Sequence, residues 1–247
     1  MDALIAELVM HLKNPDIEAL PREGLDMSAS GQTTSNLTAP ELQDSRLVSC
    51  CKKVEVEDPG LAASRPLERL EEQLEGCKAC RLWETRNKLV FGEGNELEPL
   101  IAFVGEGPGA DEDRQGRPFV GRAGQLLSAA IEKGLGLRRE DLYICNVVKC
   151  RCPNNRNPLP DEVKACLPNL LRQLELIRPG VIISLGAPAL CALSGAKEAI
   201  TKVRGEWRAW RGIDWMPTFH PAYILRNPPS KRLFWEDLKA VMGRLGL

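Results

Sequence analysis

The sequence has no long apolar run, and this absence excludes one class of protein at the outset. No stretch of its 247 residues approaches the roughly 18–20 consecutive apolar positions of a membrane-spanning helix. The first ten residues, MDALIAELVM, are acidic rather than basic and carry no cleavage-site pattern, so we expect no secretory signal. Hydrophobic residues make up 43% and charged residues 27%, values typical of a globular protein. We therefore expect a cytoplasmic protein. We also expect it to be a monomer.

The sequence also has almost no net charge. It holds 33 Lys and Arg against 34 Asp and Glu, whereas proteins that bind nucleic acid usually carry a basic excess. The balance is a cancellation between two segments. Residues 1–65 contain 6 basic and 11 acidic side chains, and residues 66–247 contain 27 and 23. The larger segment is therefore mildly basic, and the overall charge does not exclude a nucleic-acid substrate.

The same division separates two kinds of sequence. Apolar side chains recur at helical spacing over residues 2–13, and residues 24–47 are rich in Ser, Thr, Gly and Asn. We interpret residues 1–65 as an extension made of a short helix and a flexible linker. Residues 66–247 are interpreted as one folded domain.

Within that domain, short apolar runs alternate with amphipathic segments, which predicts an α/β fold with a parallel sheet covered by helices on both faces. The expected strands are residues 100–104, 142–148, 181–185 and 216–219. The expected helices are residues 66–76, 123–134, 160–177 and 233–245, with a short helix after Gly186. In such sheets the loops at the carboxyl ends of the strands form the site. These loops are residues 105–109, 146–152, the turn at Gly186 and residues 220–228.

Histidine is scarce, and the common phosphate-binding motifs are missing. The chain has only His11 and His220, and the loop GEGPG at residues 105–109 has neither the Lys-Ser/Thr of a P-loop nor GxGxxG spacing. Glycines let a backbone approach a ligand closely and expose its N–H groups. Taken alone, such a loop is most often a tight turn, and a single histidine is most often structural.

Cysteine, in contrast, is plentiful, with nine residues. Because no export signal is expected, ligands or buried thiols are favoured over disulfides. Cys77 and Cys80 form a close pair, and Cys150 and Cys166 form a wider one. Four thiolates hold either zinc or an iron–sulfur cluster, and spacing alone does not decide between them. The wide second pair makes a zinc ribbon the less favoured choice.

The other cysteines have simpler interpretations. Cys145 lies in an expected strand and Cys191 in an apolar helix, so both are predicted to be small buried hydrophobic residues. Cys152 is close enough to Cys150 to compete with it as a ligand. Cys50 and Cys51 have no pair nearby and are interpreted as incidental thiols.

Five blocks of the sequence, in order, resemble the family 4 uracil-DNA glycosylases, the iron–sulfur branch of that superfamily. The resemblance runs from about residue 74 to residue 245. The blocks are CKACRLWETRNKLVFGEGN, GEGPGADEDRQGRPFVGRAGQLL, NVVKCRCPNNRNP, IRPGVIISLGAPA and HPAYILRNP. The resemblance implies a three-layer αβα sandwich with a central four-stranded parallel sheet. It further implies an enzyme of base excision repair that flips uracil out of DNA and hydrolyses its N-glycosidic bond, leaving an abasic site.

The resemblance also implies roles for individual residues. Catalysis is expected from Glu106 and His220, and uracil binding from Gly105, Gly107, Phe119 and Asn146. Contacts to DNA are expected from Gly109, Arg122, Arg156, Gly186, Tyr223, Leu225 and Arg226, the hydrophobic ones as a wedge that also includes Ile224. A 4Fe–4S cluster is expected on Cys77, Cys80, Cys150 and Cys166. Glu106 would orient water or stabilise a cationic sugar. Glu112 and Asp113 are second candidates, although acids in a loop are usually solvated.

Some positions depart from the family pattern. Gly107 stands where Ala is common, and Cys152 and Asn154 stand where Pro and Gly are common, which argues against Cys152 as a ligand. The three tryptophans at positions 207, 210 and 215 lie among basic residues and suit a DNA-tracking face and a core equally well.

Two alternative functions stay open at this stage. One is a non-catalytic iron–sulfur module accessory to a DNA polymerase, and the other is a superfamily relative with different base specificity. The N-terminal helix is a candidate docking element for a replication or repair partner.

Overall fold

The computed structural model describes residues 66–247. The expected helix at residues 2–13, the linker at 24–47, and Cys50 and Cys51 lie outside the described residues. The division of the chain at residue 65 therefore stays a prediction. Among the helices of the described part, none combines the length and the apolar character that crossing a membrane requires.

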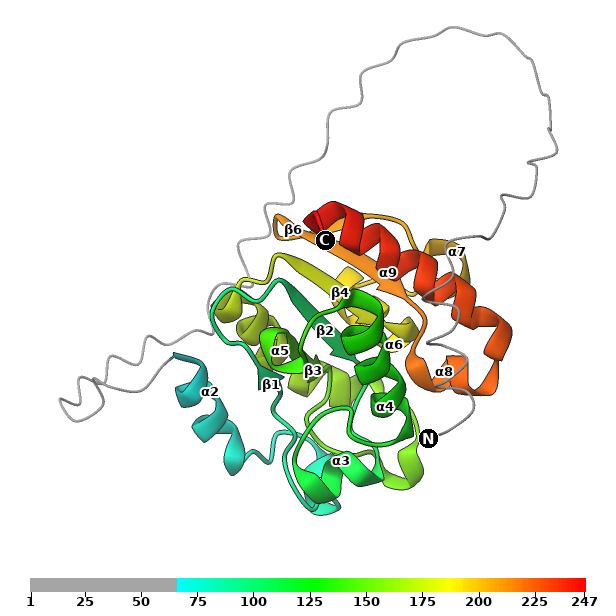
Figure 1. Ribbon diagram of the computed structural model, residues 1–247. Coiled ribbons are helices and arrows are strands. Elements are labelled where there is room, and N and C mark those ends of the chain that lie inside the picture. The colour runs from blue at the N-terminus through cyan, green and yellow to red at the C-terminus, as the bar shows by residue number, and fades with distance from the viewer. Residues whose placement is uncertain (1–65) are drawn as a thin grey trace, which may run out of the picture. The chain divides into compact units, whose positions relative to one another are not determined.

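A mixed sheet forms the centre of the described domain (Figure 1). Its strand order is β1-β3-β2-β4-β6-β5, and the four inner strands are parallel. These inner strands are β2 (Ile101–Gly105), β3 (Tyr143–Asn146), β4 (Val181–Leu185) and β6 (Ile213–Thr218). They correspond to the four predicted strands, so the predicted parallel sheet is confirmed.

The sheet has six strands rather than the predicted four, because a short antiparallel strand is added at each edge. These are β1 (Glu93–Gly94), which pairs with β3, and β5 (Arg208–Trp210), which pairs with β6. Strands of two and three residues are too short to show an alternating pattern. The turn between β5 and β6 has positive φ at Arg211 (48°) and Gly212 (84°), as tight hairpins require.

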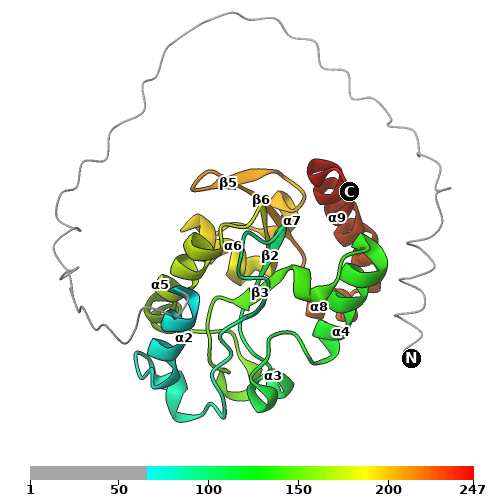
Figure 2. The same ribbon diagram turned by 60° about the vertical axis from the view of Figure 1, so that its left-hand side comes forward.

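Helices cover the two faces of the sheet (Figures 1 and 2), and a hydrophobic layer lies between the helices and the sheet on each face. The alternation of side chains along β2 shows how the two layers arise. Ala102 and Val104 face one layer, whereas Ile101 and Phe103 face the other. The first layer is closed by α2 (Pro66–Glu75), α5 (Pro160–Ile177) and α6 (Gly186–Ser194). The second is closed by α4 (Arg122–Ala129), the π turn η2 (Ala130–Leu135), α8 (Pro221–Arg226) and α9 (Lys231–Leu245). The αβα sandwich is thus confirmed.

Two helical predictions need correction. The single helix expected over residues 123–134 is α4 followed by the π turn η2, which ends at the left-handed Gly136. The loop expected before it contains α3 (Ala110–Gln115), whose buried side chains are Glu112 and Asp113. A helix that buries acids shows no apolar periodicity, so the pattern could not reveal it. Shorter elements are η1 (Arg81–Glu84), η3 (Arg139–Asp141), η4 (Pro153–Asn155), α7 (Ile200–Val203) and η5 (Pro228–Ser230).

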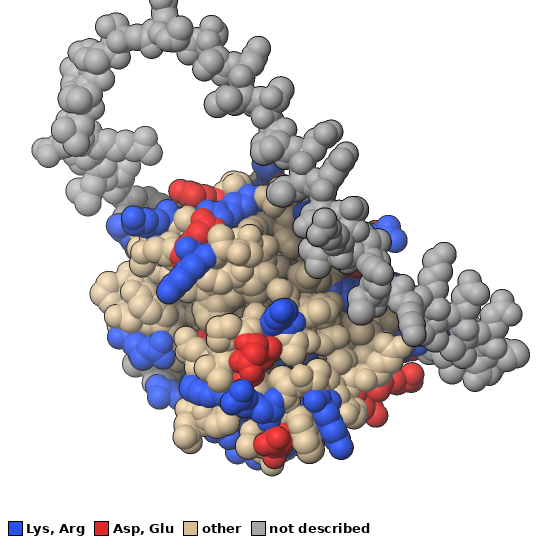
Figure 3. All heavy atoms as spheres, turned by 180° about the vertical axis from the view of Figure 1, so that it is seen from behind, with Lys and Arg blue, Asp and Glu red and all other residues tan. Residues whose placement is uncertain are grey.

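Two of the three tryptophans belong to the hydrophobic core, as one of the two interpretations predicts. Trp210 and Trp215 are buried, and the Trp215 indole donates to Ser184 Oγ at 2.8 Å. Trp207 is half-buried against the second hydrophobic layer, with the Arg244 guanidinium 4.9 Å from its ring centroid. On the face seen in Figure 3, basic side chains are scattered with acidic ones among them. That distribution is consistent with the mild positive charge of this segment.

Candidate functional site

A cleft of about 550 Å³ opens beside the carboxyl ends of the four parallel strands. The register pairs Gly105 with Asn146 and Leu185 with Thr218, so the loops that follow these strands all leave the sheet at the carboxyl ends of its strands. Most of the predicted site residues line this cleft, namely Glu106, Gly107, Gly109, Phe119, Asn146, Arg156, Gly186, His220, Tyr223 and Arg226. Gly105, Arg122 and Leu225 are outside its lining. The topology therefore brings together segments more than 100 residues apart in the sequence.

Asn146 ends β3 at the base of the cleft. Its side chain is 1% exposed, and no described donor reaches its buried Oδ1. A Cβ at Gly105 would lie 2.4 Å from that oxygen and 2.5 Å from Phe119 Cζ, so this packing requires glycine. A buried acceptor without a partner costs free energy, and Asn146 is therefore poised to accept a hydrogen bond from a ligand.

Phe119 provides an aromatic wall of the cleft. Its backbone is left-handed with φ of 51°, a conformation that is unfavourable for a bulky residue. The ring is buried, and its centroid lies 5.6 Å from that of His220 with the planes inclined by 33°. The strained backbone thus fixes an aromatic face beside the amide of Asn146.

His220 follows β6 and caps the N-terminus of α8. Its Nδ1 accepts the backbone N–H of Ala222 at 3.1 Å, which assigns the ring proton to Nε2. Burial, assisted by the positive charge of Arg226, lowers the pKa of His220 to about 4. At neutral pH the imidazole is therefore uncharged and has one N–H donor, at Nε2.

Glu106 follows β2 as the second residue of the glycine loop and lines the cleft. Burial raises the pKa of its carboxyl above the ordinary value. Among the described residues, no side chain or backbone group pairs with this carboxylate. Glu106 is consequently free to act on a ligand or on water.

The second acidic candidates turn out to be structural. Glu112 accepts the backbone N–H groups of Gly109 (3.1 Å), Val120 (2.9 Å) and Gly121 (2.9 Å). Asp113 is fully buried and accepts the backbone and side-chain amides of Asn87 at 2.8 and 2.5 Å. The expectation of solvated acids is therefore wrong, because both carboxylates replace water with amide donors. Glu112 in particular ties the glycine loop to the segment that carries Phe119.

Other ion pairs hold the remaining walls of the cleft. Arg156 makes a two-pronged contact, at 2.7 and 2.8 Å, to the buried carboxylate of Glu162. The segment before His220 is anchored through Thr218, whose hydroxyl donates to Asp237 at 2.5 Å. Arg204 donates to the same carboxylate at 2.9 Å. Arg156 therefore lines the cleft while its guanidinium is paired with Glu162. Arg122 and Arg226, in contrast, are exposed.

Part of the predicted DNA wedge belongs to the core. Ile224 is fully buried, so its inclusion in the wedge is wrong. Tyr223 and Leu225 are half-buried, and the Tyr223 ring lies 5.0 Å from that of Phe219. Their contact with DNA stays a prediction.

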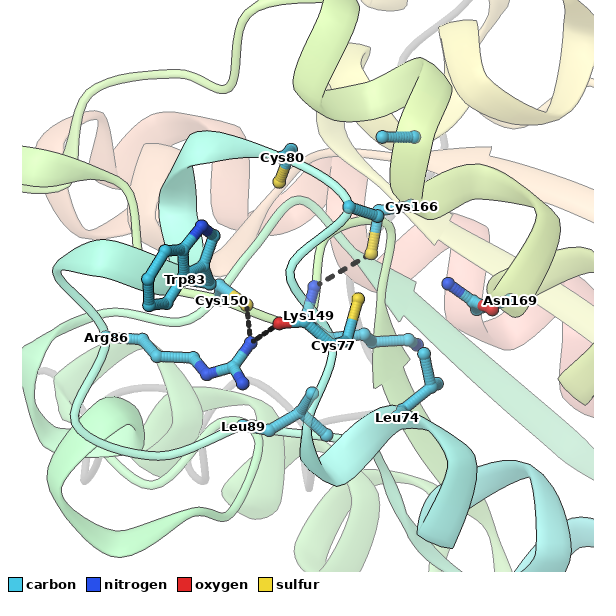
Figure 4. A pocket seen from close by; sticks show the side chains of 12 residues that line it. Leu74, Cys77, Cys80, Trp83, Arg86, Leu89, Lys149, Cys150, Cys166 and Asn169 are labelled. Carbon is cyan, nitrogen blue, oxygen red and sulfur yellow. Dashed lines mark hydrogen bonds between the residues drawn. The ribbon is translucent and has the colours of Figure 1, made fainter.

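Four cysteines surround a second cavity, next to α2 (Figure 4). Cys77 and Cys80 come from the segment after α2, Cys150 from the loop after β3 and Cys166 from α5. The Arg86 guanidinium donates to Cys150 Sγ at 3.2 Å, and the Lys149 backbone N–H donates to Cys166 Sγ at 3.4 Å. The structure thus brings together the four thiols that the sequence singles out.

Two of these thiols thus accept hydrogen bonds, Cys150 from a guanidinium and Cys166 from a backbone N–H. N–H groups directed at sulfur are typical of iron–sulfur sites, and four thiols are the donor set that such a cluster takes. The four cysteines therefore fit an iron–sulfur cluster, and as a donor set they also fit a zinc ion.

The remaining cysteines differ from one another. Cys145 is buried as predicted, whereas Cys191 is partly exposed, because an apolar helix pattern does not show which face meets solvent. Cys152 lines the cleft rather than the four-cysteine cavity. Burial raises its pKa to about 11, with a further contribution from Glu162, so this thiol stays protonated at neutral pH.

The sequence analysis missed Lys149, a buried residue between the two cavities. Its Nζ donates to the backbone carbonyl of Asn146 at 2.8 Å and to the side-chain carbonyl of Gln173. The Gln173 amide in turn donates to the hydroxyl of Tyr143 at 2.9 Å. No pattern in the sequence distinguishes this lysine from a solvated one, since its burial depends on α5 packing over β3.

Comparisons with known proteins agree with this geometry. The family model described as the uracil DNA glycosylase superfamily matches residues 91–239. A type-4 uracil-DNA glycosylase of Thermotoga maritima is 51% identical over 182 residues, covering 70% of this chain and 91% of the relative. One from Saccharolobus solfataricus is 45% identical over 187 residues, covering 72% and 86%. A DNA polymerase of Bacillus phage SP01 is 34% identical over 165 residues, which are 66% of this chain but 18% of the polymerase.

The carboxylate of Glu112 offers a direct test of how the cleft is held. Glu112→Gln turns one of its acceptor oxygens into an NH₂ group facing backbone N–H donors. We expect the free energy of unfolding in urea to fall by about 1.5–3 kcal/mol. The neighbouring Asp111→Asn, which alters an exposed ion pair with Arg114, should cost less than about 1 kcal/mol. Equal losses for the two variants would contradict the bracing role of Glu112.

Proposed function

This chain belongs to the uracil-DNA glycosylase superfamily, and from that premise we propose that it is a monofunctional repair enzyme that excises uracil from DNA. The observation that carries the proposal is the unpaired, buried Oδ1 of Asn146, beside an aromatic ring and a neutral imidazole. The names of the type-4 relatives support the same substrate. The product is DNA with an abasic site and free uracil.

Base recognition follows from the hydrogen-bonding inventory of Asn146. Its Oδ1 accepts from N3–H of an extruded uracil, while its Nδ2 donates to O4. Cytosine presents the opposite pattern at both atoms and would leave buried groups unpaired, which gives large discrimination. Stacking on Phe119 contributes roughly 1–3 kcal/mol and offsets part of the cost of flipping the base.

Bond cleavage requires stabilisation of the leaving uracil, which departs as an anion with charge on O2. We assign this task to the Nε2–H of His220, which is available because Nδ1 is held by Ala222. A neutral imidazole keeps its proton and stabilises the anion by hydrogen bonding. Glu106 lies on the same cleft and, once ionised, orients the attacking water or stabilises the cationic sugar.

DNA itself is held around the cleft. We assign phosphate contacts to the backbone N–H group at Gly186 and to Arg122, Arg156 and Arg226. Gly109, whose N–H is bonded to Glu112, contacts DNA in this proposal through close approach of its backbone. Tyr223 and Leu225 fill the gap left by the flipped base. Residues 66–247 form the glycosylase domain in this proposal, and residues 1–65 serve as an extension that docks a replication or repair partner.

We further propose that Cys77, Cys80, Cys150 and Cys166 hold a 4Fe–4S cluster. When bound, the cluster supplies a crosslink between segments rather than a step of the reaction. These cysteines join the chain before β1 to the loop after β3 and to α5. Arg86 supports the arrangement by bonding both the Cys150 thiol and the Cys77 carbonyl, the latter at 3.0 Å.

The central test is release of free uracil from an oligonucleotide that contains it. We expect wild-type protein to release uracil and to leave an alkali-labile site. His220→Ala should slow excision roughly 10²–10³-fold, the usual cost of one oxyanion donor. Asn146→Ala should slow it by at least about 10-fold and weaken discrimination against cytosine. Protein that binds such DNA but never releases uracil would instead be a non-catalytic module, and release of another base would mean a different specificity.

The pH dependence of excision distinguishes a neutral from a charged His220. Because its pKa lies at about 4, the rate should show no step near the ordinary histidine pKa of 6.5. The rate should fall only at lower pH, as Glu106 is protonated with a pKa above its ordinary 4.5. Glu106→Gln should lower the rate and remove this acid limb. A rate that rises as pH falls through 6.5 would show that the imidazolium is the donor.

Metal analysis tests the cluster. Purified protein should be coloured and should hold about four irons per chain. Cys166→Ser should lose both colour and iron, whereas Cys191→Ser, which is outside the cavity, should keep them. Zinc-loaded, colourless protein would refute the assignment.

A further inference from the structure

Arg139 makes an unusual set of contacts for a residue outside the cleft. It lies in η3, and its side chain is 15% exposed. Its guanidinium donates to the backbone carbonyl of Phe119 at 3.1 Å, to that of Pro118, and to Ser128 Oγ at 2.9 Å. Its Nε donates to Glu93 at 2.8 Å. Arg139 thus joins the edge strand β1, helix α4 and the turn that carries Phe119.

The turn whose carbonyls accept hydrogen bonds from Arg139 is under backbone strain. Phe119 has positive φ, and a residue with a side chain keeps that conformation only where its surroundings enforce it. Helix α4 supplies one constraint, because a Cβ at Gly124 would lie 1.9 Å from the Phe119 oxygen. The bonds from Arg139 to two successive carbonyls supply the other.

A surface pocket of about 430 Å³ adjoins the turn and is lined by Val120, Ser128 and Arg139 as well as by Phe119 itself. The turn therefore meets open space on the side that Arg139 lines. Without the guanidinium, relief of the positive φ would favour a change in the conformation of Phe119.

Glu93 completes the arrangement. It accepts from Arg139 through Oε1 and from Arg117 through Oε2, the latter at 2.7 Å. Although burial opposes ionisation, these hydrogen bonds lower the pKa of Glu93 below its ordinary value. The carboxylate thus orients the Arg139 guanidinium from the edge of the sheet.

We propose that Arg139 is a positioning residue for base recognition, which holds Phe119 in its left-handed conformation so that the ring faces the flipped uracil. The proposal rests on the proposed function in one respect, that Phe119 stacks on the base. Arg139 touches neither the base nor the reacting atoms and acts only through Phe119.

A double-mutant cycle tests this dependence, with single-turnover excision of uracil as the measurement. Arg139→Ala and Phe119→Ala should each slow excision roughly 5- to 150-fold, the factor that one base–aromatic stack is worth. The double variant should be no slower than Phe119→Ala alone. Affinity for undamaged DNA should stay within about twofold for Arg139→Ala, since no phosphate contact is lost. Multiplicative losses in the double variant would overturn the proposal.

The adjacent Arg138→Ala is the matched control. Arg138 is exposed and pairs with Glu140 and Asp141, so its loss should leave excision unchanged. If Arg139→Ala does not fold, Arg139→Lys replaces it. The lysine keeps the charge beside Glu93 but cannot reach both carbonyls, so it should show the same dependence on Phe119.

A stability cycle separates failure of this proposal from failure of the proposed function. Phe119→Gly relieves the positive φ, so Arg139→Ala should lower Tm less in the glycine background than in the wild type. If wild-type protein excises no uracil, the proposed function fails, and this cycle still tests the grip of Arg139 on the turn. An equal loss of Tm in both backgrounds would show that Arg139 does not hold the turn.

Discussion

The cleft depends on one close approach, that of Gly105 to Asn146 and Phe119. The parallel register of β2 and β3 places Gly105 beside Asn146, and the Phe119 ring closes over both. Any side chain at position 105 would occupy the space of the amide or of the ring. The unpaired acceptor and the aromatic wall therefore exist only because two strand ends and one strained turn meet at a residue without a Cβ.

Buried carboxylates stabilise the loops around Gly105, Asn146 and Phe119. Glu112 joins the glycine loop to the Phe119 segment, Glu162 holds Arg156, and Asp237 anchors the strand that leads to His220. Each carboxylate accepts from amides, a hydroxyl or guanidinium groups, and partners of this kind offset the cost of burying a charge. The acidic side chains thus fall into two groups. The paired ones organise loops, whereas Glu106 is the one described acid lining the cleft whose carboxylate has no partner.

The two cavities are joined through β3 and the residues after it. Asn146 ends the strand, Lys149 bonds back to its carbonyl, and Cys150 follows at once. The loop that carries a proposed cluster ligand is therefore the loop that supports base recognition. A cluster held as proposed would therefore support Asn146 through this short connection, as well as the segment after α2 and helix α5.

Apolar patterning was sufficient to predict the four inner strands, α5 with its bounds and the two-faced core. The reason is that the positions of the apolar residues along the chain, alternate or helically spaced, show which side chains will be buried. The loops that form the cleft could be named because they follow the carboxyl ends of the predicted strands. The four thiols of the second cavity were named from cysteine spacing and from the family resemblance instead. Helix α3, the edge strands, the contacts of Arg139 and the buried Lys149 could not be predicted in this way. Their buried side chains are polar or their strands are only two or three residues long, so they show no apolar periodicity. The sequence by itself thus determined which segments meet at the carboxyl edge of the sheet. Only the tertiary structure decided which charges are paired, that His220 is neutral and that Asn146 is left with a free acceptor, because each depends on distances between segments that only folding brings together.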